Sequence, residues 1–153
     1  MRHLRGFTLI ELMVALVIAE ILLAIAFPSY QDYVRRGIRS SGQQFLMDIA
    51  QRQEPYFLDQ RQYASLLGTG AGGLNVTMPP DVAAKYQAPV FAVDNAATPP
   101  AFTMSLAPIA GGVMGGDGTL VINNLQQRWR EIDGNSTFGT NDCRWEDTRC
   151  TPS

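Results

Sequence analysis

Residues 5–12 read RGFTLIEL, and the chain then remains apolar almost without interruption as far as Phe27. From Phe7 to Phe27 the only charged side chains are Glu11 and Glu20. About 20 helical residues span roughly 30 Å, which is the thickness of the hydrocarbon core of a membrane. We therefore expect a transmembrane helix here, and its two carboxylates need an explanation.

A short basic stretch precedes this segment, because residues 1–6 read MRHLRG. A secretory signal peptide places an apolar core of about 7–15 residues before its cleavage site, whereas Gly6 stands before the apolar core here. Cleavage after Gly6 would leave the helix on the mature chain. Arg2 and Arg5 favour a cytoplasmic N-terminus, with the polar remainder of the chain outside. On hydropathy alone, a plain N-terminal membrane anchor fits equally well.

Two stretches, GFTLIELM at residues 6–13 and AIAFPSYQDY at residues 24–33, resemble the N-terminus of a type IV prepilin. The resemblance implies that residues 1–6 are a leader peptide and that a prepilin peptidase cuts between Gly6 and Phe7. It also implies that the new N-terminal amine, that of Phe7, is methylated. Residues 7–27 would then be both the transmembrane helix and the helix of the filament core.

The resemblance also gives Glu11 a role. An unpaired carboxylate in lipid costs several kcal/mol, so Glu11 needs a partner or must be neutral. In type IV pilins the partner is the methylated amine, here that of Phe7, first in the same chain and then in a neighbouring subunit. There the pair would help to set the register between subunits. A protonated Glu11 that merely tolerates the bilayer is the alternative.

Glu20 departs from the family pattern, because major pilins usually carry a glycine at this position. At about 100° per residue, the nine positions from Glu11 to Glu20 turn the helix half a turn beyond two full turns. The two carboxylates therefore lie on opposite faces. We expect Glu20 either to make a second intramembrane contact with another subunit or to be protonated in the membrane.

Residues 28–58 have the pattern of an amphipathic continuation of the helix. Apolar side chains recur on one stripe at Val34, Ile38, Phe45, Ile49 and Tyr56. Pro28 lacks an N–H, and we expect it to kink the helix rather than end it. Pro55 disfavours helical geometry in the residue before it, so we expect the helix to end within residues 53–58.

Glycine and proline mark residues 59–84 as an exposed connection. Residues 85–132 then contain four short stretches that read as strands, at 85–93, 101–109, 119–124 and 128–132. If these strands form a small antiparallel sheet that packs on the helical stripe, the apolar face of the sheet and the apolar stripe of the helix bury each other. We therefore expect an α+β architecture, and this is the type IV pilin fold that the resemblance implies.

Two looser likenesses point to one branch of the family. They are LMDIAQRQE at residues 46–54 and TLVINNLQQRW at residues 119–129, and both resemble PilE-type minor pilins. They favour a minor pilin over a major pilin or a type II secretion pseudopilin.

Cys143 and Cys150 are the only cysteines, and the expected topology puts them outside the cell, where disulfides persist. The family resemblance implies that residues 133–153 form a C-terminal disulfide-bounded loop. Closing about eight residues would stabilise the fold by roughly 2–3 kcal/mol. A redox pair is the alternative, but the spacing is not Cys-x-x-Cys and nearby acids disfavour thiolates.

Asp133 to Thr137 reads DGNST, an oxygen-rich stretch typical of calcium loops. Counted from Asp133, however, Phe138 stands where an EF-hand needs glycine and Arg144 where it needs glutamate. A solvated turn and a calcium site of another kind both remain open. We expect no metal and no other cofactor.

The chain carries 12 basic and 14 acidic side chains, and its one histidine, His3, lies in the leader. No nucleophile and base stand together in the sequence, so we expect no enzyme and no catalytic residue. A basic and aromatic cluster could contact nucleic acid; it comprises Arg128, Trp129, Arg130, Arg144, Trp145 and Arg149. Acids interleave with it, namely Glu131, Asp133, Asp142, Glu146 and Asp147. We therefore expect it to pack against neighbouring subunits, and we do not expect nucleic acid as a partner.

The resemblance leads us to expect a minor pilin that takes part in pilus assembly and initiation, and so in twitching motility and adhesion. Its expected partners are other major and minor pilins, prepilin peptidase and the inner-membrane assembly machinery. It would lie in the bacterial inner membrane before assembly, with its N-terminus cytoplasmic, and in the extracellular pilus afterwards. The alternatives are a ligand-binding pilin for DNA uptake or adhesion and a type II secretion pseudopilin.

Overall fold

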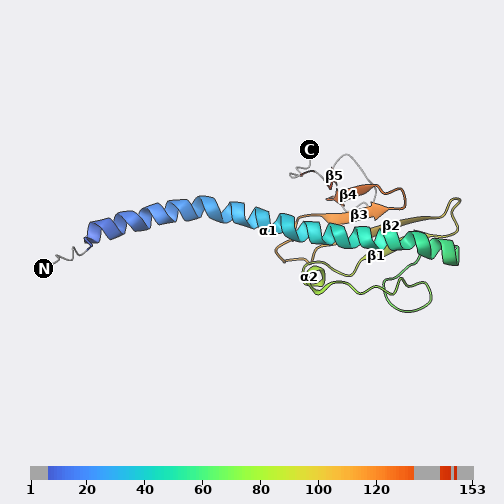
Figure 1. Cartoon of the computed structure of the whole chain (residues 1–153). Helices are drawn as coiled ribbons and strands as arrows, with labels where there is room; N and C mark the ends of the chain where they lie inside the picture. Colours follow the sequence, from blue (N-terminus) through green and yellow to red (C-terminus); the bar gives the residue numbers. More distant parts are fainter. Residues whose placement is uncertain (1–6, 133–141, 146, 148–153) are drawn as a thin grey trace. The chain divides into compact units, whose positions relative to one another are not determined.

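The computed structural model describes residues 7–132, 142–145 and 147 (Figure 1). The chain divides into two compact units, an N-terminal unit (Met1–Gly37) and a head (Ile38–Ser153). A long helix, α1 (Leu9–Gln60), begins in the first unit and ends in the second. The other elements are α2 (Pro80–Ala83), β1 (Val90–Asp94), β2 (Ala101–Leu106), β3 (Thr119–Asn123), β4 (Arg128–Glu131) and β5 (Cys143–Arg144).

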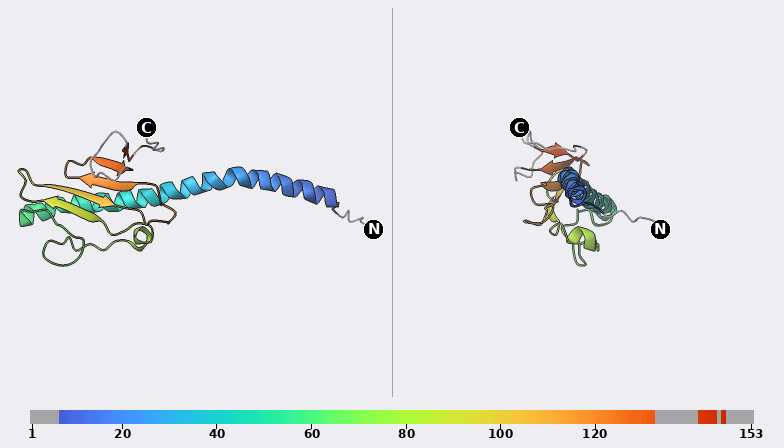
Figure 2. Two further views of the ribbon diagram at one scale, coloured as in Figure 1. Left: turned by 180° about the vertical axis from the view of Figure 1, so that it is seen from behind. Right: turned by 90° about the vertical axis from the view of Figure 1, so that its left-hand side faces the viewer.

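The strands of the head form one antiparallel sheet in the order β1-β2-β3-β4-β5. The left-hand view of Figure 2 shows its strands running along the C-terminal part of α1. Side chains alternate along a strand, so Phe102, Met104 and Leu106 of β2 share one face, and all three are buried. The predicted α+β architecture, a long helix packed on a small antiparallel sheet, is confirmed.

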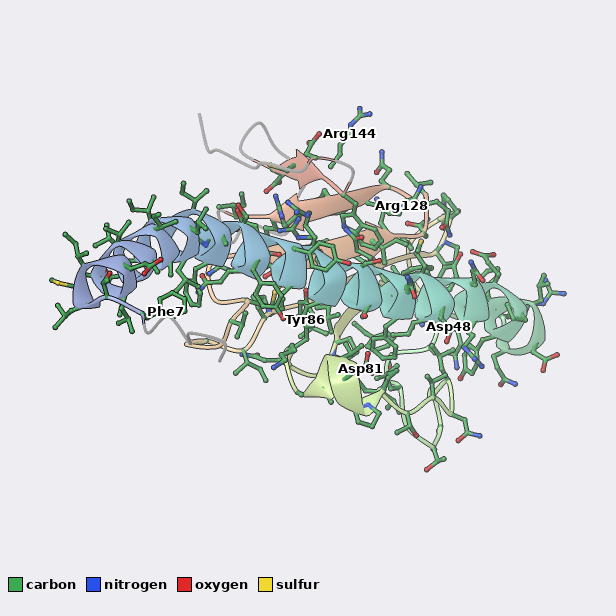
Figure 3. The ribbon with its side chains drawn as sticks, turned by 60° about the vertical axis from the view of Figure 1, so that its left-hand side comes forward. Phe7, Asp48, Asp81, Tyr86, Arg128 and Arg144 are labelled. Carbon is green, nitrogen blue, oxygen red and sulfur yellow. The ribbon has the colours of Figure 1, made fainter. Side chains whose placement is uncertain are left out.

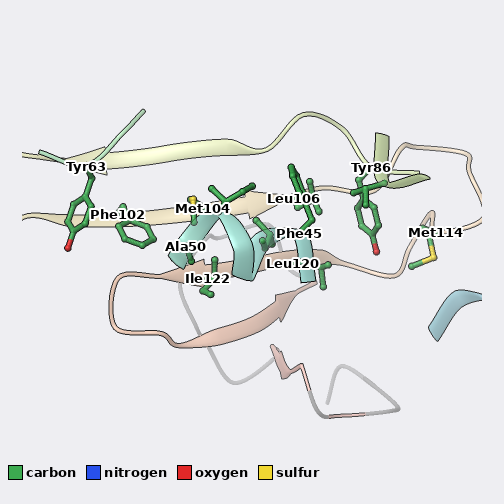
Figure 4. Packing of buried hydrophobic residues seen from close by; sticks show 13 residues of the cluster. Phe45, Ala50, Tyr63, Tyr86, Phe102, Met104, Leu106, Met114, Leu120 and Ile122 are labelled. Atoms are coloured by element: carbon green, nitrogen blue, oxygen red, sulfur yellow. The ribbon is translucent and has the colours of Figure 1, made fainter. Parts of the chain in front are cut away.

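The core lies between α1 and the sheet (Figure 4). The helix contributes two adjacent rows of buried residues, which are Gly42, Phe45, Leu46, Ile49, Ala50 and Gln53. Of the predicted stripe, Phe45 and Ile49 are buried, whereas Val34, Ile38 and Tyr56 are half-buried. Gly42 lets the helix approach closely, because a Cβ there would stand 3.0 Å from the ring of Tyr86.

The helix ends later than the sequence predicts. It continues through Pro55 to Gln60, and Arg61 then turns the chain in the left-handed conformation, with φ of 58°. The N–H of Arg61 donates to the carbonyl of Phe57 at 2.9 Å, which closes the last turn. Phe57 also stacks on Tyr63 with ring centroids 4.6 Å apart. These contacts stabilise the turns after Pro55.

The sheet is shorter at its start and longer at its end than predicted. Residues 85–89 are not a continuous strand. The N–H groups of Lys85 and Tyr86 both donate to Val82 of α2, a helix that begins at a proline within the predicted connection, and Tyr86 keeps only an isolated antiparallel bridge with Pro108. At the other end β5 pairs Arg144 with Trp129 and so extends the sheet into the predicted C-terminal loop.

Two side-chain amides fix the chain that follows α1. Gln53, fully buried in the helix, donates to the carbonyl of Ala64 at 2.9 Å and accepts from its N–H at 2.8 Å. Asn95 does the same for Tyr63, at 3.2 and 2.7 Å. Each amide thus bonds both the N–H and the carbonyl of one residue, as a neighbouring strand would do. The connection is therefore tied to the helix and to the end of β1.

Candidate functional site

The N-terminal unit presents an apolar helical surface. This part of α1 is long and apolar enough to cross a membrane by length and composition, and none of its most apolar window is buried. Phe7, Leu9 and Ile10 are 83%, 79% and 71% exposed. An apolar surface of this size needs lipid or protein around it.

Glu11 sits in the first turn of α1 and forms a capping box with Thr8. Its N–H donates to the Thr8 hydroxyl at 3.3 Å, while its Oε2 accepts from the Thr8 N–H at 3.5 Å and from the Thr8 hydroxyl at 3.4 Å. The side chain of each residue thus accepts a hydrogen bond from the backbone N–H of the other at the start of the helix. The spacing Thr-x-x-Glu is a sequence signal for this box, and it was missed. The expected amine partner, that of Phe7, exists only after cleavage.

Glu20 and Pro28 both lie within α1. The side chain of Glu20 is exposed and makes no hydrogen bond or ion pair with the part of the chain that the structure describes. The helix continues through Pro28, and the hydroxyl of Ser29 donates to the carbonyl of Ile25 at 3.5 Å. The kink at Pro28 stays a prediction.

A buried ionic cluster joins three elements of the head. Asp117, before β3, accepts from Arg39 of α1 through both carboxylate oxygens, with Nε to Oδ2 at 2.8 Å and a second bond from Nη2 to Oδ1. Arg130 of β4 places Nη1 3.5 Å from the same Oδ1. The three side chains are only 13%, 11% and 4% exposed. Desolvation, followed by the charge of Arg39, lowers the pKa of Arg130. Sequence reasoning missed Asp117 altogether.

Tyr86 borders this cluster and is almost fully buried (labelled in Figure 3). Its hydroxyl finds no hydrogen-bond partner among the residues that the structure describes. Burial, and then the nearby charge of Asp117, raise the pKa of Tyr86, while Arg39 and Arg130 lower it by less. The hydroxyl therefore stays protonated in the folded head at neutral pH.

The predicted basic and aromatic cluster is divided by the fold. Trp129, Arg130 and Glu131 are buried, whereas Arg128 and Arg144 are exposed, and Figure 3 shows both on the β4–β5 side of the head. Arg149, Asp133 and Glu146 lie outside the described residues.

Arg128 is held without a carboxylate. Its Cζ lies 6.0 Å from the ring centroid of Trp145, and its Nη1 lies 3.5 Å from the sulfur of Met47. Trp145 is fixed in turn, because its Nε1 donates to the carbonyl of Trp129 at 2.8 Å. Within the described ranges no acidic group pairs with Arg128.

Three further expectations concern the two cysteines, the stretch from Asp133 to Thr137 and metal binding. Cys143 lies in β5, but Cys150 is outside the described residues, so their disulfide stays a prediction. The stretch from Asp133 to Thr137, where a calcium site was left open, is outside them too. Among the described residues no group of three or more His, Cys, Asp or Glu side chains could hold a metal ion.

Two family models match the sequence. The model described as "Type IV minor pilin ComP, DNA uptake sequence receptor" matches residues 28–118, which is more than half of the chain. The model described as "Prokaryotic N-terminal methylation motif" matches residues 1–27. Together they cover the chain from its first residue to Gly118.

Individual relatives are similar over part of the chain. The type IV major pilin protein PilE1 of Neisseria gonorrhoeae is 39% identical over 85 residues, which are 54% of this chain and 48% of that protein. The prepilin peptidase-dependent protein D of Escherichia coli (strain K12) is 42% identical over 71 residues, 46% of this chain and 41% of that protein. The fimbrial protein EcpC of Eikenella corrodens is 66% identical over 32 residues, 21% of each chain. The chain thus spans between about a fifth and a half of these relatives. No solved structure matches it.

One expectation needs correction. The sequence led us not to expect nucleic acid as a partner, yet the matching family is described as a DNA uptake sequence receptor. Among the acids that the structure describes, Glu131 is buried and Asp147 accepts from the backbone N–H of Arg144 at 2.9 Å, so their nearness in the sequence did not show whether they pair with Arg128.

Proposed function

Because this chain belongs to the type IV minor pilin family, we propose that it is a structural subunit that takes part in pilus assembly and initiation, and thereby in twitching motility and adhesion. The exposed apolar helix that carries the methylation motif is the observation that supports this most. Its partners are other major and minor pilins. The helix would pack in the filament core, with the head outward.

Maturation follows from the N-terminal motif. Prepilin peptidase cuts between Gly6 and Phe7 and methylates the amine of Phe7. Before assembly the helix anchors the subunit in the inner membrane, with its N-terminus on the cytoplasmic side because Arg2 and Arg5 precede it. The inner-membrane assembly machinery then transfers the subunit to the pilus.

Glu11 sets the register between subunits in this proposal. Both contacts from Thr8 go to Oε2, and Oε1 has no partner among the described residues. Oε1 can therefore accept from a methylated amine, first that of Phe7 in its own chain and then that of a neighbour. Such a pair removes the cost of a lone carboxylate in lipid. Glu20, on the opposite face, offers a second contact within the filament core.

The test is a deletion combined with an analysis of sheared pili. We expect the deletion to reduce surface piliation and twitching, and we expect mass spectrometry to detect the protein in wild-type pili. E11Q should be processed normally but be depleted from the pilus fraction, whereas S40A should not. Normal piliation without the protein, together with its absence from pili, would contradict the proposal.

Contact with DNA is a second candidate, favoured by the guanidinium of Arg128, which lies over Trp145 and pairs with no acidic group among the described residues, and by the exposed Arg144 nearby. Arginines of this kind bind phosphate, and an indole can stack on a base. The purified full chain should then bind a labelled DNA duplex, with R128Q and R144Q each weakening binding and reducing its salt dependence by about one counterion. R52Q, which removes an arginine already paired with Asp48, is the control. Equal binding by all variants would exclude this surface.

A further inference from the structure

We propose that five side chains at the end of the membrane segment and just beyond it form a collar that binds anionic phospholipid headgroups around the unassembled subunit. They are Phe27, Tyr30, Tyr33, Arg35 and Arg36, all in the N-terminal unit. The inference rests on the proposed membrane placement of residues 7–27 and goes beyond it by naming the lipid contact.

The depth of Tyr30 fits the headgroup layer, and Tyr33 lies at its outer edge, from which a helical side chain leans back toward the N-terminus. If Phe27 marks the end of the hydrocarbon core, a rise of 1.5 Å per residue places Tyr30 about 5 Å and Tyr33 about 9 Å beyond it. The headgroup region is roughly 5–8 Å thick on each side. Phe27, Tyr30 and Tyr33 are 64%, 66% and 70% exposed in the subunit. Amphipathic aromatic rings concentrate at this depth of a membrane.

The two arginines follow directly. Arg35 and Arg36 lie about 12 and 14 Å beyond Phe27 by the same rise, so their long side chains can reach back to the phosphates while their stems cover apolar surface. Both are exposed, and neither forms an ion pair or hydrogen bond within the part of the chain that the structure describes. Arg39 does not join them, because Asp117 binds it in the head.

Asp32 is the acidic group that could compete. It stands three and four positions before the two arginines, a spacing at which helical side chains can pair. The structure forms no such pair among the described residues, and Asp32 itself is exposed. The two guanidinium groups are therefore left to an external anion.

The order of side chains along the helix selects lipid over protein as the occupant. Apolar residues give way first to aromatic and then to cationic ones, which is the order of environments from the hydrocarbon core through the headgroups to water. A protein neighbour would impose no such order with depth. Each arginine near an anionic headgroup should contribute about five-fold in association, which corresponds to about 1 kcal/mol.

The experiment measures lipid selectivity of the full chain. The protein is reconstituted in phosphatidylcholine vesicles that contain a trace of spin-labelled phosphatidylglycerol, and electron paramagnetic resonance gives the fraction of label immobilised by the protein. R35Q/R36Q should lower the association of phosphatidylglycerol relative to phosphatidylcholine by about five-fold for each arginine in contact. R52Q/R61Q, which removes two exposed arginines from the head, is the matched control and should leave it unchanged.

The outcomes separate this inference from the proposed function. If the wild type and R35Q/R36Q show equal selectivity for phosphatidylglycerol, the collar is contradicted. It is also contradicted if R52Q/R61Q lowers that selectivity as much as R35Q/R36Q does. Unchanged selectivity combined with loss of R35Q/R36Q from pili would assign the arginines to a subunit contact instead. If alkaline carbonate extracts the wild-type protein from native membranes, the proposed membrane anchor itself is contradicted.

Discussion

Asp117 is the residue whose loss should cost the head most, because it pairs with two arginines that are themselves nearly buried. D117N keeps the shape of the side chain but removes its charge, and Asp117 is the only acid that forms an ion pair with Arg39 and Arg130 among the described residues. We expect it to lower the free energy of unfolding by about 3 kcal/mol. Urea unfolding of the full chain in detergent, followed by the fluorescence of Trp129 and Trp145, measures this.

A surface ion pair provides the comparison. Asp48 pairs with Arg52 at 2.9 Å, but both side chains are about half exposed. D48N should therefore change the free energy of unfolding by less than about 0.5 kcal/mol. Similar losses of unfolding free energy in D117N and D48N would show that the cluster around Asp117 stabilises the head no more than a surface ion pair does.

The raised pKa of Tyr86 gives a pH dependence with a definite sign. An unfolded tyrosine loses its proton near pH 10, whereas the buried hydroxyl of the folded head keeps it to higher pH. The unfolded state then binds fewer protons, so stability is full below about pH 10 and falls as the pH rises above it.

Y86F should show a shallower fall in alkaline solution than the wild type, because it removes the hydroxyl that titrates. The same urea unfolding, repeated between neutral pH and strongly alkaline pH, tests this. Y33F removes an exposed hydroxyl and serves as the control. Identical slopes in Y86F and the wild type would disprove a role for Tyr86.

Local and distant contacts differ in how far the sequence could predict them. The capping box of Thr8 and Glu11 is set by a spacing of three residues, so the sequence contained it. Arg39 and Asp117 stand 78 positions apart, and only the packing of α1 against the β2–β3 connection brings them together. No pattern in either segment indicates the other. The charge of Arg130 was visible, but its burial was not.

Among the elements, the centres of the strands were predictable and their ends were not. Alternating apolar residues identified β2 and β3, because one buried face requires that period. The ends depend on contacts outside the strand itself, as where the N–H of Tyr86 donates to Val82 of α2 and Tyr86 keeps only an isolated bridge with Pro108. The rule for Pro55 failed for the same reason, since Phe57 and Arg61 stabilise the turns beyond it.

The amide of Gln53 ties an element to a loop, and its removal should be costly. Q53A deletes two hydrogen bonds and leaves the N–H and the carbonyl of Ala64 unpaired in a fully buried site. We expect a loss of about 2–4 kcal/mol in the free energy of unfolding. Q51A, at an exposed position of the same helix, should change it by less than about 0.5 kcal/mol. Equal effects would contradict the proposed anchor.

At the scale of the whole molecule, the two units differ in how they bury their apolar surface. The head buries its own core between α1 and the sheet, whereas the N-terminal unit leaves its apolar surface exposed. The chain therefore depends on two successive environments for that surface, lipid and then other pilins, in our account. The exposed apolar surface of the N-terminal unit could be predicted from the sequence, because a continuous apolar run carries it without any distant contact.

Intact mass of the protein purified from its native membrane tests the central claim most directly. A pilin processed as proposed should lack residues 1–6 and carry one additional methyl group, located on Phe7 by fragmentation. G6A is the matched variant, and its mass should include the leader if the peptidase requires that glycine. A full-length, unmethylated wild-type protein would contradict the account and leave a membrane-anchored domain whose Glu11 has no amine to pair with.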